Sequence, residues 1–350
     1  MLKLNKDVRV IDLFSGIGGL TYGFQSAGLN VVAGIDNDES CAYGYETSNK
    51  TKFILRDIND VSTSDIEELF GEAEIKVLAG CAPCQPYSKL NPRGTTHQKM
   101  APLSKFAALI RSTKPHIVSM ENVSGLCNIE KYPVFKEFLA TLDDLHYHHD
   151  YRVINTADYG VPQNRVRLVL LASQLGPISI PKPTHGTHIT LREAIGDLPP
   201  IIHGEANDGD PLHYSSQLND LNLRRIKATP RNGGTQKSWP EELLLECHKK
   251  ESGKTFSSVY GRMWWDRPGS TMTTQCNGLG NGRHGHPDQN RAISLREAAR
   301  IQTFPDNYVF YDDEAGLKYG EVAKFIGNAV PVRLGQVLGN AILSHIRSKL

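Results

Sequence analysis

The chain has 350 residues, of which 39% are hydrophobic, and its 39 Lys and Arg residues against 38 Asp and Glu residues give a formal net charge of +1. This length and composition are typical of a globular protein that buries a large core, built as one large domain with a smaller one. They exclude a membrane-spanning protein, because no run of about 18 apolar residues occurs, and the polar N-terminus is unlike a secretion signal, so we expect a cytoplasmic location.

Short apolar runs alternate with helical patterns through the first 172 residues and predict β-strands. The runs cover residues 8–14, 31–35, 52–55, 75–79, 117–120, 151–157 and 166–172. Alternation of this kind predicts an α/β fold with a mostly parallel sheet and helices on both faces. The last two runs are joined by a turn-rich segment and predict a hairpin at the edge of the sheet.

The first predicted strand runs into a glycine-rich turn at residues 12–20, and a helical pattern follows. Glycines there let the backbone approach a ligand, and the helix N-terminus favours negative groups. The dinucleotide fingerprint requires a glycine where Thr21 stands, which weakens a nicotinamide interpretation. Asp36 ends the next strand, where an acidic side chain commonly binds ribose hydroxyls. The turn is therefore a candidate cofactor site, with a tight turn that binds no ligand as the alternative.

Residues 80–88 follow the fourth predicted strand and place Cys84 between Pro83 and Gln85. A thiolate at the carboxyl end of a buried strand would be a strong nucleophile. Cys81 and Cys84 also form a C-x-x-C pair, which leaves a redox pair, half of a zinc site or a merely buried cysteine as alternatives. No second pair supplies further zinc ligands, so we expect no metal. The six cysteines lack framework spacing, which indicates reduced thiols.

Two later motifs offer partners to this nucleophile. Glu121 ends the predicted strand at residues 117–120, where a carboxyl group on the same sheet edge would be placed for acid catalysis, although such a residue is more often only solvated. Alternation puts Arg165 and Arg167 on one face of a strand, which suits a phosphate or carboxylate. Exposed arginines on an edge strand are the alternative.

Residues 176–211 are rich in Pro and Gly and mark a domain boundary. Beyond them strand and helix signals weaken and predict a loop-rich domain, until residues 327–331 introduce a final helix. We expect residues 1–185, completed by 320–350, to form the larger domain and residues 186–319 the smaller one.

Positive charge is concentrated late in the chain. Residues 1–150 carry 15 Lys and Arg against 19 Asp and Glu, whereas residues 213–291 carry 12 against 7. The later excess suits a polyanionic partner, although most charge runs are only solvated faces.

Six motifs follow one another in order along nearly the whole chain. They are residues 12–19, 83–85, 121–123, 163–167, 296–306 and 327–330. In this order they resemble the DNA cytosine-5 methyltransferases of the bacterial modification type. The resemblance implies a Rossmann-like catalytic domain, S-adenosylmethionine as methyl donor, and a target-recognition domain at residues 186–319.

The resemblance also implies roles for single residues of this sequence. Cys84 would add to C6 of a flipped cytosine while Glu121 protonates or hydrogen-bonds N3, with Arg165 and Arg167 beside them. The implied cofactor-binding residues are Phe14, Gly16, Gly18, Gly19, Asp36, Asn37, Asp57, Ile58, Pro83, Asn328 and Val330. The implied DNA-binding residues are Gln85, Ser88 and Thr271.

The implied function is sequence-specific methyl transfer to C5 of cytosine in duplex DNA, in a restriction-modification setting. The expected partners are double-stranded DNA and a restriction endonuclease acting on the same site, and we expect a monomer. The alternatives are a tRNA cytosine-5 methyltransferase of the same family and a catalytically silent DNA-binding homologue. The long segment between the fourth and fifth motifs favours DNA, and the presence of Cys84 and Glu121 argues against a silent homologue.

The chain departs from the family pattern at Cys81 and Ala82, where many relatives have Gly and Pro. This departure leaves the predicted nucleophile in place. For the helical residues 296–300 we expect packing rather than base contact, and for Trp264 and Trp265 a place in the core.

Overall fold

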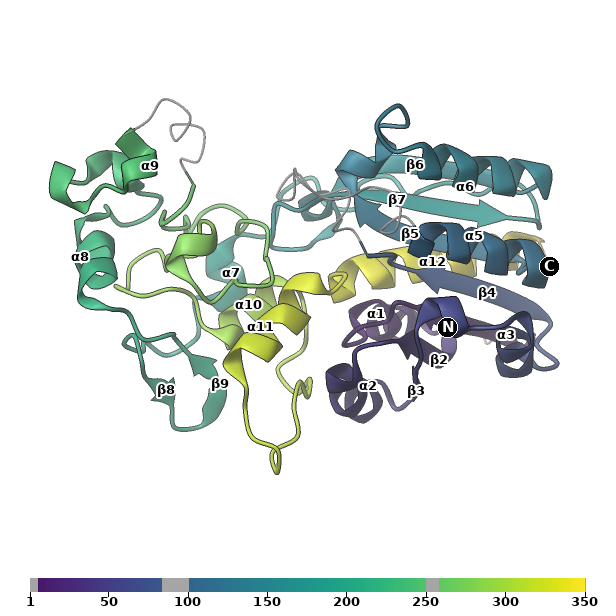
Figure 1. Ribbon diagram of the computed structural model, residues 1–350, viewed down its shortest axis with the longest axis horizontal. Helices are drawn as coiled ribbons and strands as arrows, with labels where there is room; N and C mark the ends of the chain where they lie inside the picture. The colour runs from purple at the N-terminus through teal and green to yellow at the C-terminus, as the bar shows by residue number, and fades with distance from the viewer. Residues whose placement is uncertain (1–5, 84–100, 250–257, 350) are drawn as a thin grey trace. The chain divides into compact units, whose positions relative to one another are not determined.

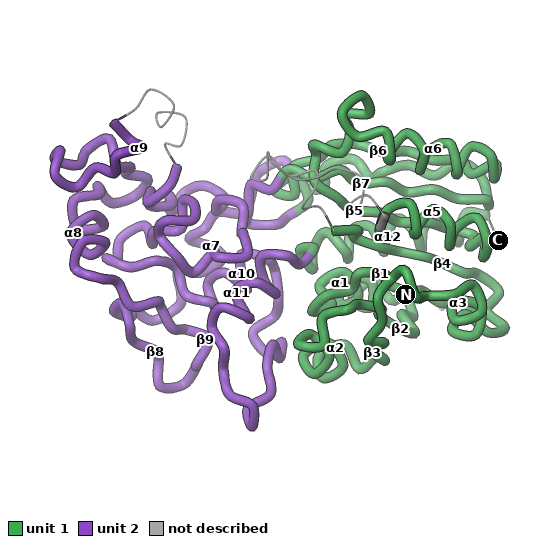
Figure 2. Tube along the Cα trace, viewed as in Figure 1, with its two compact units in different colours: residues 1–159, 166–184, 330–350 green, residues 160–165, 185–329 purple. Residues whose placement is uncertain are grey.

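A computed structural model (Figure 1) describes residues 6–83, 101–249 and 258–349. The chain divides into two compact units, coloured separately in Figure 2. Unit 1 comprises residues 1–159, 166–184 and 330–350, and unit 2 comprises residues 160–165 and 185–329.

Unit 1 is built on a seven-stranded sheet with the order β3-β2-β1-β4-β5-β7-β6 (Figure 1). The strands are β1 Val8–Leu13, β2 Asn30–Asp36, β3 Lys52–Leu55, β4 Ile75–Gly80, β5 Ile117–Val123, β6 His148–Asn155 and β7 Val166–Ser173. Neighbours from β3 to β5 pair in parallel, whereas β7 runs antiparallel to both β5 and β6. The seven predicted strands, the mostly parallel sheet and the hairpin at its edge are confirmed.

Helices cover both faces of this sheet, because alternate residues of each strand point to opposite sides. The helices of unit 1 are α1 Gly19–Ala27, α2 Ala42–Asn49, α3 Thr63–Phe70, α5 Ala101–Thr113, α6 Pro133–Asp144 and α12 Val332–Lys349. Val10 and Val77 pack with α1 and α12, whereas Ile11 and Leu78 pack with α3, α5 and α6. Two apolar layers therefore enclose the sheet, as the fold class predicted.

Close packing of α1 against α12 depends on a glycine. A Cβ atom on Gly23 would lie 2.4 Å from the carbonyl oxygen of Val332, which no side chain tolerates. The predicted C-terminal helix is thus part of the core of unit 1.

The strand order reverses between β1 and β4. In open α/β sheets, ligands bind at the carboxyl ends of the strands beside such a reversal. The backbone N–H of Cys81, just after β4, donates to the carbonyl of Leu13 at the end of β1 over 3.3 Å. The turn after β1 and the loop after β4 therefore start side by side.

Unit 2 has little regular structure, as predicted. Its helices and strands are α7 Leu191–Ile195, β8 Ala206–Asn207, β9 Asp210–Tyr214, α8 Asp220–Ala228, α9 Glu246–Lys249, α10 Leu295–Ile301 and α11 Tyr319–Asn328. Buried polar side chains hold its loops together. The guanidinium of Arg262, for example, is 1% exposed and donates to the carbonyls of Ile226, Thr229 and His286.

Some residues that we expected in the larger domain belong to unit 2, namely 160–165, 185 and 320–329. The buried Gln163 amide donates to Gln302 over 2.7 Å, and its oxygen accepts the backbone N–H of Met272 over 2.9 Å. Residues 320–329 form most of α11, which packs against α10. These contacts explain the different bounds, while the target-recognition role of the smaller domain stays a prediction.

Candidate active site

The carboxyl end of β5 carries a buried acid, Glu121, which is 3% exposed. Its Oε1 lies 3.2 Å from Nε of Arg167 on the neighbouring strand β7. Its Oε2 accepts a hydrogen bond from the thiol of Cys81, with the sulfur 2.9 Å away. Within the described part of the chain, Oε1 accepts no hydrogen bond. Cys81, Glu121 and Arg167 together form what we call the Glu121 cluster.

Asn122 fixes the loop that follows β4. Its side chain is 1% exposed, and its Nδ2 donates to the carbonyl of Ala82 over 3.0 Å. The next residue, Pro83, is exposed. The sequence alone does not identify Asn122 as a residue that holds this backbone. Its position directly after Glu121 at the strand end could have suggested such a role. Three predicted site residues lie outside the described residues: Cys84, Gln85 and Ser88.

The turn after β1 has the backbone conformation of a ligand loop. Phe14, Gly16 and Gly18 all have positive φ angles, of 57°, 49° and 95°. The N–H of Gly16 donates to Oδ2 of Asp36 over 2.8 Å, which bends the turn toward the end of β2. No described atom lies within 4 Å of the place that a Cβ on Gly16 would take. The turn therefore leaves open space above its backbone, as a cofactor site requires.

Asp36 lies at the end of β2, where its two oxygens accept the N–H groups of Gly16 and Asp38. Burial raises the pKa of the Asp36 carboxyl, and these two hydrogen bonds oppose the rise. Its oxygens are therefore positioned as fixed acceptors at the candidate cofactor site.

Asp57 follows β3, beside Asn37, whose Nδ2 donates to Asp57 Oδ2 over 3.3 Å. Both residues line an open pocket of about 480 Å³. The N–H of Asn59 lowers the pKa of the Asp57 carboxyl. Asn37 and Asp57 thus offer one amide and one carboxylate to a polar ligand.

Asp12 is a buried acid within β1 to which no role was predicted. A charged residue inside an apolar strand could have marked it as a candidate for a structural or functional role. It is 1% exposed and accepts the hydroxyl of Thr21 over 2.7 Å, and Thr21 lies 3.0 Å from the hydroxyl of Tyr45. Burial raises the pKa of Asp12 to about 7, opposed by the Thr21 hydroxyl and assisted by the charge of Asp36. The bond to Thr21 ties α1 to the end of β1 and so fixes the turn between them.

The remaining predicted cofactor residues are distributed over both units. Gly19 begins α1, Ile58 is buried behind Asp57, and Val330 is buried in the apolar layer of α1 and α12. Asn328 is exposed at the end of α11 in unit 2.

Arg165 and Arg167 have different surroundings. β7 begins at Val166, so only Arg167 of the pair lies in the strand. Arg165 is 3% exposed, and its guanidinium donates to the carbonyls of Met272, Gly327 and Ala329 over 3.0 to 3.4 Å. Arg165 therefore ties distant segments of unit 2 together, and its catalytic role stays a prediction.

Thr271 lies beside a pocket of about 430 Å³ in unit 2. Its hydroxyl donates to the carbonyl of Asn164 over 2.7 Å. Trp264 also lines the pocket, with the guanidiniums of Arg267 and Arg283 at 4.9 and 4.2 Å from its ring. None of the described residues that line the pocket is acidic, so it suits an anionic ligand. Trp264 and Trp265 are partly exposed, contrary to the expectation that both belong to the core.

The helical motif at residues 296–300 supports packing, as predicted. The guanidinium of Arg296 pairs with Asp210 over 2.5 Å, and that of Arg300 pairs with Asp197 and Asp306 over 2.6 Å. These ion pairs join α10 to β9 and to the segments that carry Asp197 and Asp306, so the two arginines are engaged within unit 2.

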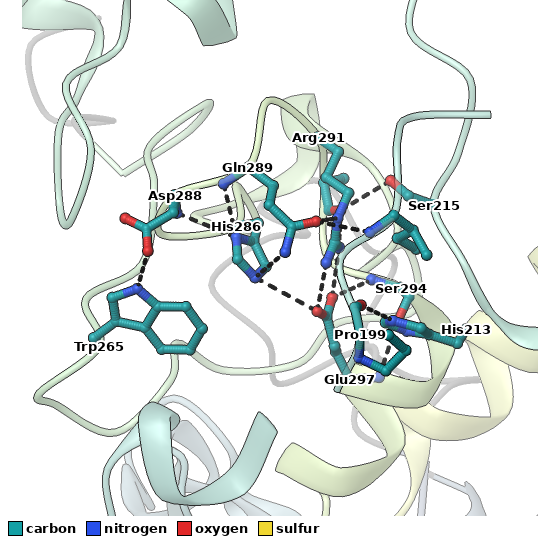
Figure 3. Close-up of polar contacts among 12 residues, drawn as sticks. Pro199, His213, Ser215, Trp265, His286, Asp288, Gln289, Arg291, Ser294 and Glu297 are labelled. Atoms are coloured by element: carbon teal, nitrogen blue, oxygen red, sulfur yellow. Dashed lines mark hydrogen bonds and ion pairs between the residues drawn. The ribbon is translucent and has the colours of Figure 1, made fainter. Parts of the chain in front are cut away.

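Glu297, which also lies in α10, forms a buried ion pair with Arg291 (Figure 3). Both side chains are 1% exposed, and two N–H···O contacts of 2.7 Å join them. Glu297 also accepts the N–H of Ser294 and lies 3.6 Å from Nε2 of His286. Burial alone would raise the pKa of Glu297, but Arg291, His286 and the Ser294 N–H lower it to about 2. His286, Arg291, Ser294 and Glu297 form what we call the Glu297 cluster.

Five cysteines fall within the described residues, and all are free thiols. No group of three or more His, Cys, Asp or Glu side chains among these residues is arranged to hold a metal ion. The helices described here also include none that is long and apolar enough to cross a membrane.

Comparison with known proteins agrees with this geometry. A family model described as C-5 cytosine-specific DNA methylase matches residues 8–344. The Type II methylase M.HgiDII of Herpetosiphon aurantiacus is 49% identical over 335 residues, which cover 95% of this chain and 94% of that protein. The Type II methyltransferase M.XorII of Xanthomonas oryzae is 31% identical, over 97% of this chain and 85% of that protein.

A solved structure shows the same fold. It is that of a DNA modification methyltransferase encoded within an Escherichia coli prophage, with a TM-score of 0.76 at 20% identity, over 97% of this chain and 99% of that one. The Dnmt2 methyltransferase of S. pombe gives a TM-score of 0.62 at 17% identity, over 97% of this chain and 99% of that one.

Proposed function

This chain belongs to the C-5 cytosine-specific DNA methylase family, and from that premise we propose that it modifies one cytosine within a specific sequence of duplex DNA, as the methyltransferase of a restriction-modification system. The observation that carries the proposal is the Glu121 cluster, a buried carboxyl group at the carboxyl end of β5. Such a group can act on a ring nitrogen of a flipped base, because a buried acid is shielded from competing water.

Cys84 is the proposed nucleophile. In the sequence it directly follows Pro83, and the Asn122 side chain holds the carbonyl of Ala82 two residues before it. Its thiolate would form a bond to C6 of cytosine, and the electron pair of the C5–C6 double bond would shift into the ring as N3 takes a proton from Glu121. The adduct is an enamine with a nucleophilic C5. As C5 takes the methyl group, N3 returns its proton to Glu121. A base then removes the C5 proton, the C5–C6 double bond re-forms and the thiolate leaves.

The residues around the β1 turn fit S-adenosylmethionine. The open space at Gly16 admits the ligand close to the backbone, Asp36 supplies acceptors for ribose hydroxyls, and Asp57 with Asn37 supplies polar groups for the adenine. Phe14 and Gly18 shape the same turn. When bound, this cofactor supplies an electrophilic methyl group on a sulfonium sulfur.

We propose that unit 2 is the target-recognition domain and contacts the DNA. The pocket beside Thr271, which has no acidic residue among its described lining, and the positive charge of residues 213–291 support this role. Gln85 and Ser88, which follow Cys84 in the sequence, would also contact DNA. We propose further that the enzyme acts as a cytoplasmic monomer and shares its site with a restriction endonuclease.

Labelled methyl groups should pass from S-adenosylmethionine to duplex DNA when the purified protein is added. Bisulfite sequencing of DNA from an expressing host should then reveal one methylated cytosine motif. Transcribed tRNA serves as the control substrate. Labelling of tRNA without any methylated DNA motif would contradict the proposed substrate.

Asp36→Ala is expected to weaken S-adenosylmethionine binding about ten- to a hundredfold, because hydrogen bonds to a charged group contribute about 1.5–3 kcal/mol. Isothermal titration calorimetry measures the loss. Asp36→Asn keeps an oxygen that accepts the Gly16 N–H, so its loss of affinity should be smaller. Glu67→Ala, which removes an exposed acid from α3, is the control. Equal affinity in all three variants would remove Asp36 from the cofactor site.

Glu121→Gln is expected to lower kcat for methyl transfer about 10²-fold or more, the usual effect of removing a positioned general acid. The amide keeps the shape of the side chain. It can donate a hydrogen bond to N3, but it is too weak an acid to transfer a proton to it. Steady-state kinetics with duplex DNA measure the effect, and Glu137→Gln on the exposed face of α6 is the control. Near-normal turnover in Glu121→Gln would contradict the proposed role.

A further inference from the structure

The thiol of Cys81 has no part in the chemistry proposed above, yet it touches the acid on which that chemistry depends. Its sulfur lies 2.9 Å from Oε2 of Glu121. The backbone of Cys81 is itself anchored, because its N–H donates to the carbonyl of Leu13 at the end of β1. The thiol is therefore presented to Glu121 from a fixed point at the carboxyl end of β4.

The two oxygens of Glu121 are held from different strands. Arg167 on β7 approaches Oε1 to 3.2 Å, and Cys81 after β4 binds Oε2. The contacts on both sides restrict rotation of the carboxyl group, which is 3% exposed. Oε1 accepts no hydrogen bond from any described residue, so it is the oxygen that remains available to a ligand.

We propose that Cys81 is a positioning residue for the methyl-transfer reaction. Its thiol proton, donated to Oε2, holds Glu121 so that Oε1 is the oxygen presented to the cytosine ring. A thiol is a weak donor, but its bond to Oε2 strengthens as Glu121 gives up its proton and becomes a carboxylate. The inference rests on the proposed role of Glu121. Many relatives have glycine where this chain has Cys81, and glycine has no side chain that could bind Glu121. The inference therefore gives this difference a physical consequence.

Cys81→Ala is expected to lower kcat about tenfold, which corresponds to about 1.4 kcal/mol of transition-state stabilisation. KM for DNA and for S-adenosylmethionine should stay unchanged, because the proposed effect of the thiol is on the orientation of Glu121. Cys81→Ser keeps a donor at the same place and should restore kcat to within about twofold. Cys127→Ala removes another half-buried thiol of unit 1 and should leave kcat unchanged.

A second readout isolates the addition step. Reversible thiolate addition at C6 makes the C5 hydrogen exchangeable, so tritium release from C5-labelled DNA without cofactor reports on Cys84 and Glu121 together. This rate should fall by the same factor as kcat in Cys81→Ala and recover in Cys81→Ser. A variant that only loosened the fold would not recover with serine.

The double variant Cys81→Ala/Glu121→Gln separates this inference from the proposed function. If Cys81 acts through Glu121, the double variant is no slower than Glu121→Gln alone, because the two effects are not additive. Normal kcat in Cys81→Ala, or an additive loss in the double variant, overturns the inference and leaves the role of Glu121 intact. Normal kcat in Glu121→Gln overturns both.

Discussion

Cys84→Ala is expected to abolish methyl transfer to duplex DNA while the protein still binds DNA and S-adenosylmethionine. The proposed reaction needs a covalent bond from sulfur to C6, since C5 of an unactivated cytosine is a poor nucleophile. A methyl side chain cannot form that bond, so the variant loses the step that makes C5 nucleophilic. Transfer of labelled methyl groups measures the loss, and fluorescence anisotropy with labelled duplex measures binding.

Cys81→Ala is the matched control, because it removes the other thiol of the same C-x-x-C pair. It should keep about a tenth of the activity, as for loss of about 1.4 kcal/mol. Abolished activity in Cys81→Ala with retained activity in Cys84→Ala would exchange the roles of the two cysteines. Loss of DNA binding in Cys84→Ala would instead indicate that the substitution damages the DNA-binding surface.

The sheet was predictable because its signal is local. The seven apolar runs and the turn signals between them place every strand of unit 1 to within a few residues. The positions of Glu121 and of the Gly16 turn at one edge of the sheet were predictable for the same reason, since strand ends in a parallel sheet meet at one edge. Their roles stay predictions.

Side-chain partners were less predictable, because they depend on contacts between distant segments. The alternation of side chains along a strand predicts the same surroundings for Arg165 and Arg167. In the structure Arg167 forms an ion pair with Glu121, whereas Arg165 donates hydrogen bonds to backbone carbonyls of unit 2. The bond from Cys81 to Glu121 joins residues 40 positions apart. No spacing rule along the chain predicts which of two cysteines faces an acid on the next strand.

The two Leu-Arg-Glu-Ala segments of unit 2 show the same limit. Both begin a helix with a capping box, Thr190 with Glu193 in α7 and Ser294 with Glu297 in α10. Glu193 is exposed, whereas Glu297 is buried against Arg291. The sequence predicts both caps and does not distinguish the glutamate that also pairs with a buried arginine.

Glu297→Ala is expected to lower the free energy of unfolding of unit 2 by about 3–5 kcal/mol, the usual cost of breaking a buried ion pair by removing one partner. The reason is that the Arg291 guanidinium, 1% exposed, would keep its charge without its bidentate acceptor. All three tryptophans lie in unit 2, so tryptophan fluorescence during urea unfolding reports on this unit. Glu193→Ala removes the capping glutamate of α7, whose side chain is exposed, and should cost much less.

The cost of Glu297→Ala should also depend on pH in a defined direction. The pKa of Glu297 lies near 2 in the folded protein, below its ordinary value of 4.5, so the folded state binds fewer protons than the unfolded state between these values. The stabilisation is therefore complete above pH 4.5 and is lost as pH falls toward 2. The difference in unfolding free energy between wild type and Glu297→Ala should shrink over that interval, whereas the Glu193→Ala difference should stay small throughout. An equal cost for both variants at pH 7 would mean that the buried pair contributes no more than an ordinary helix cap.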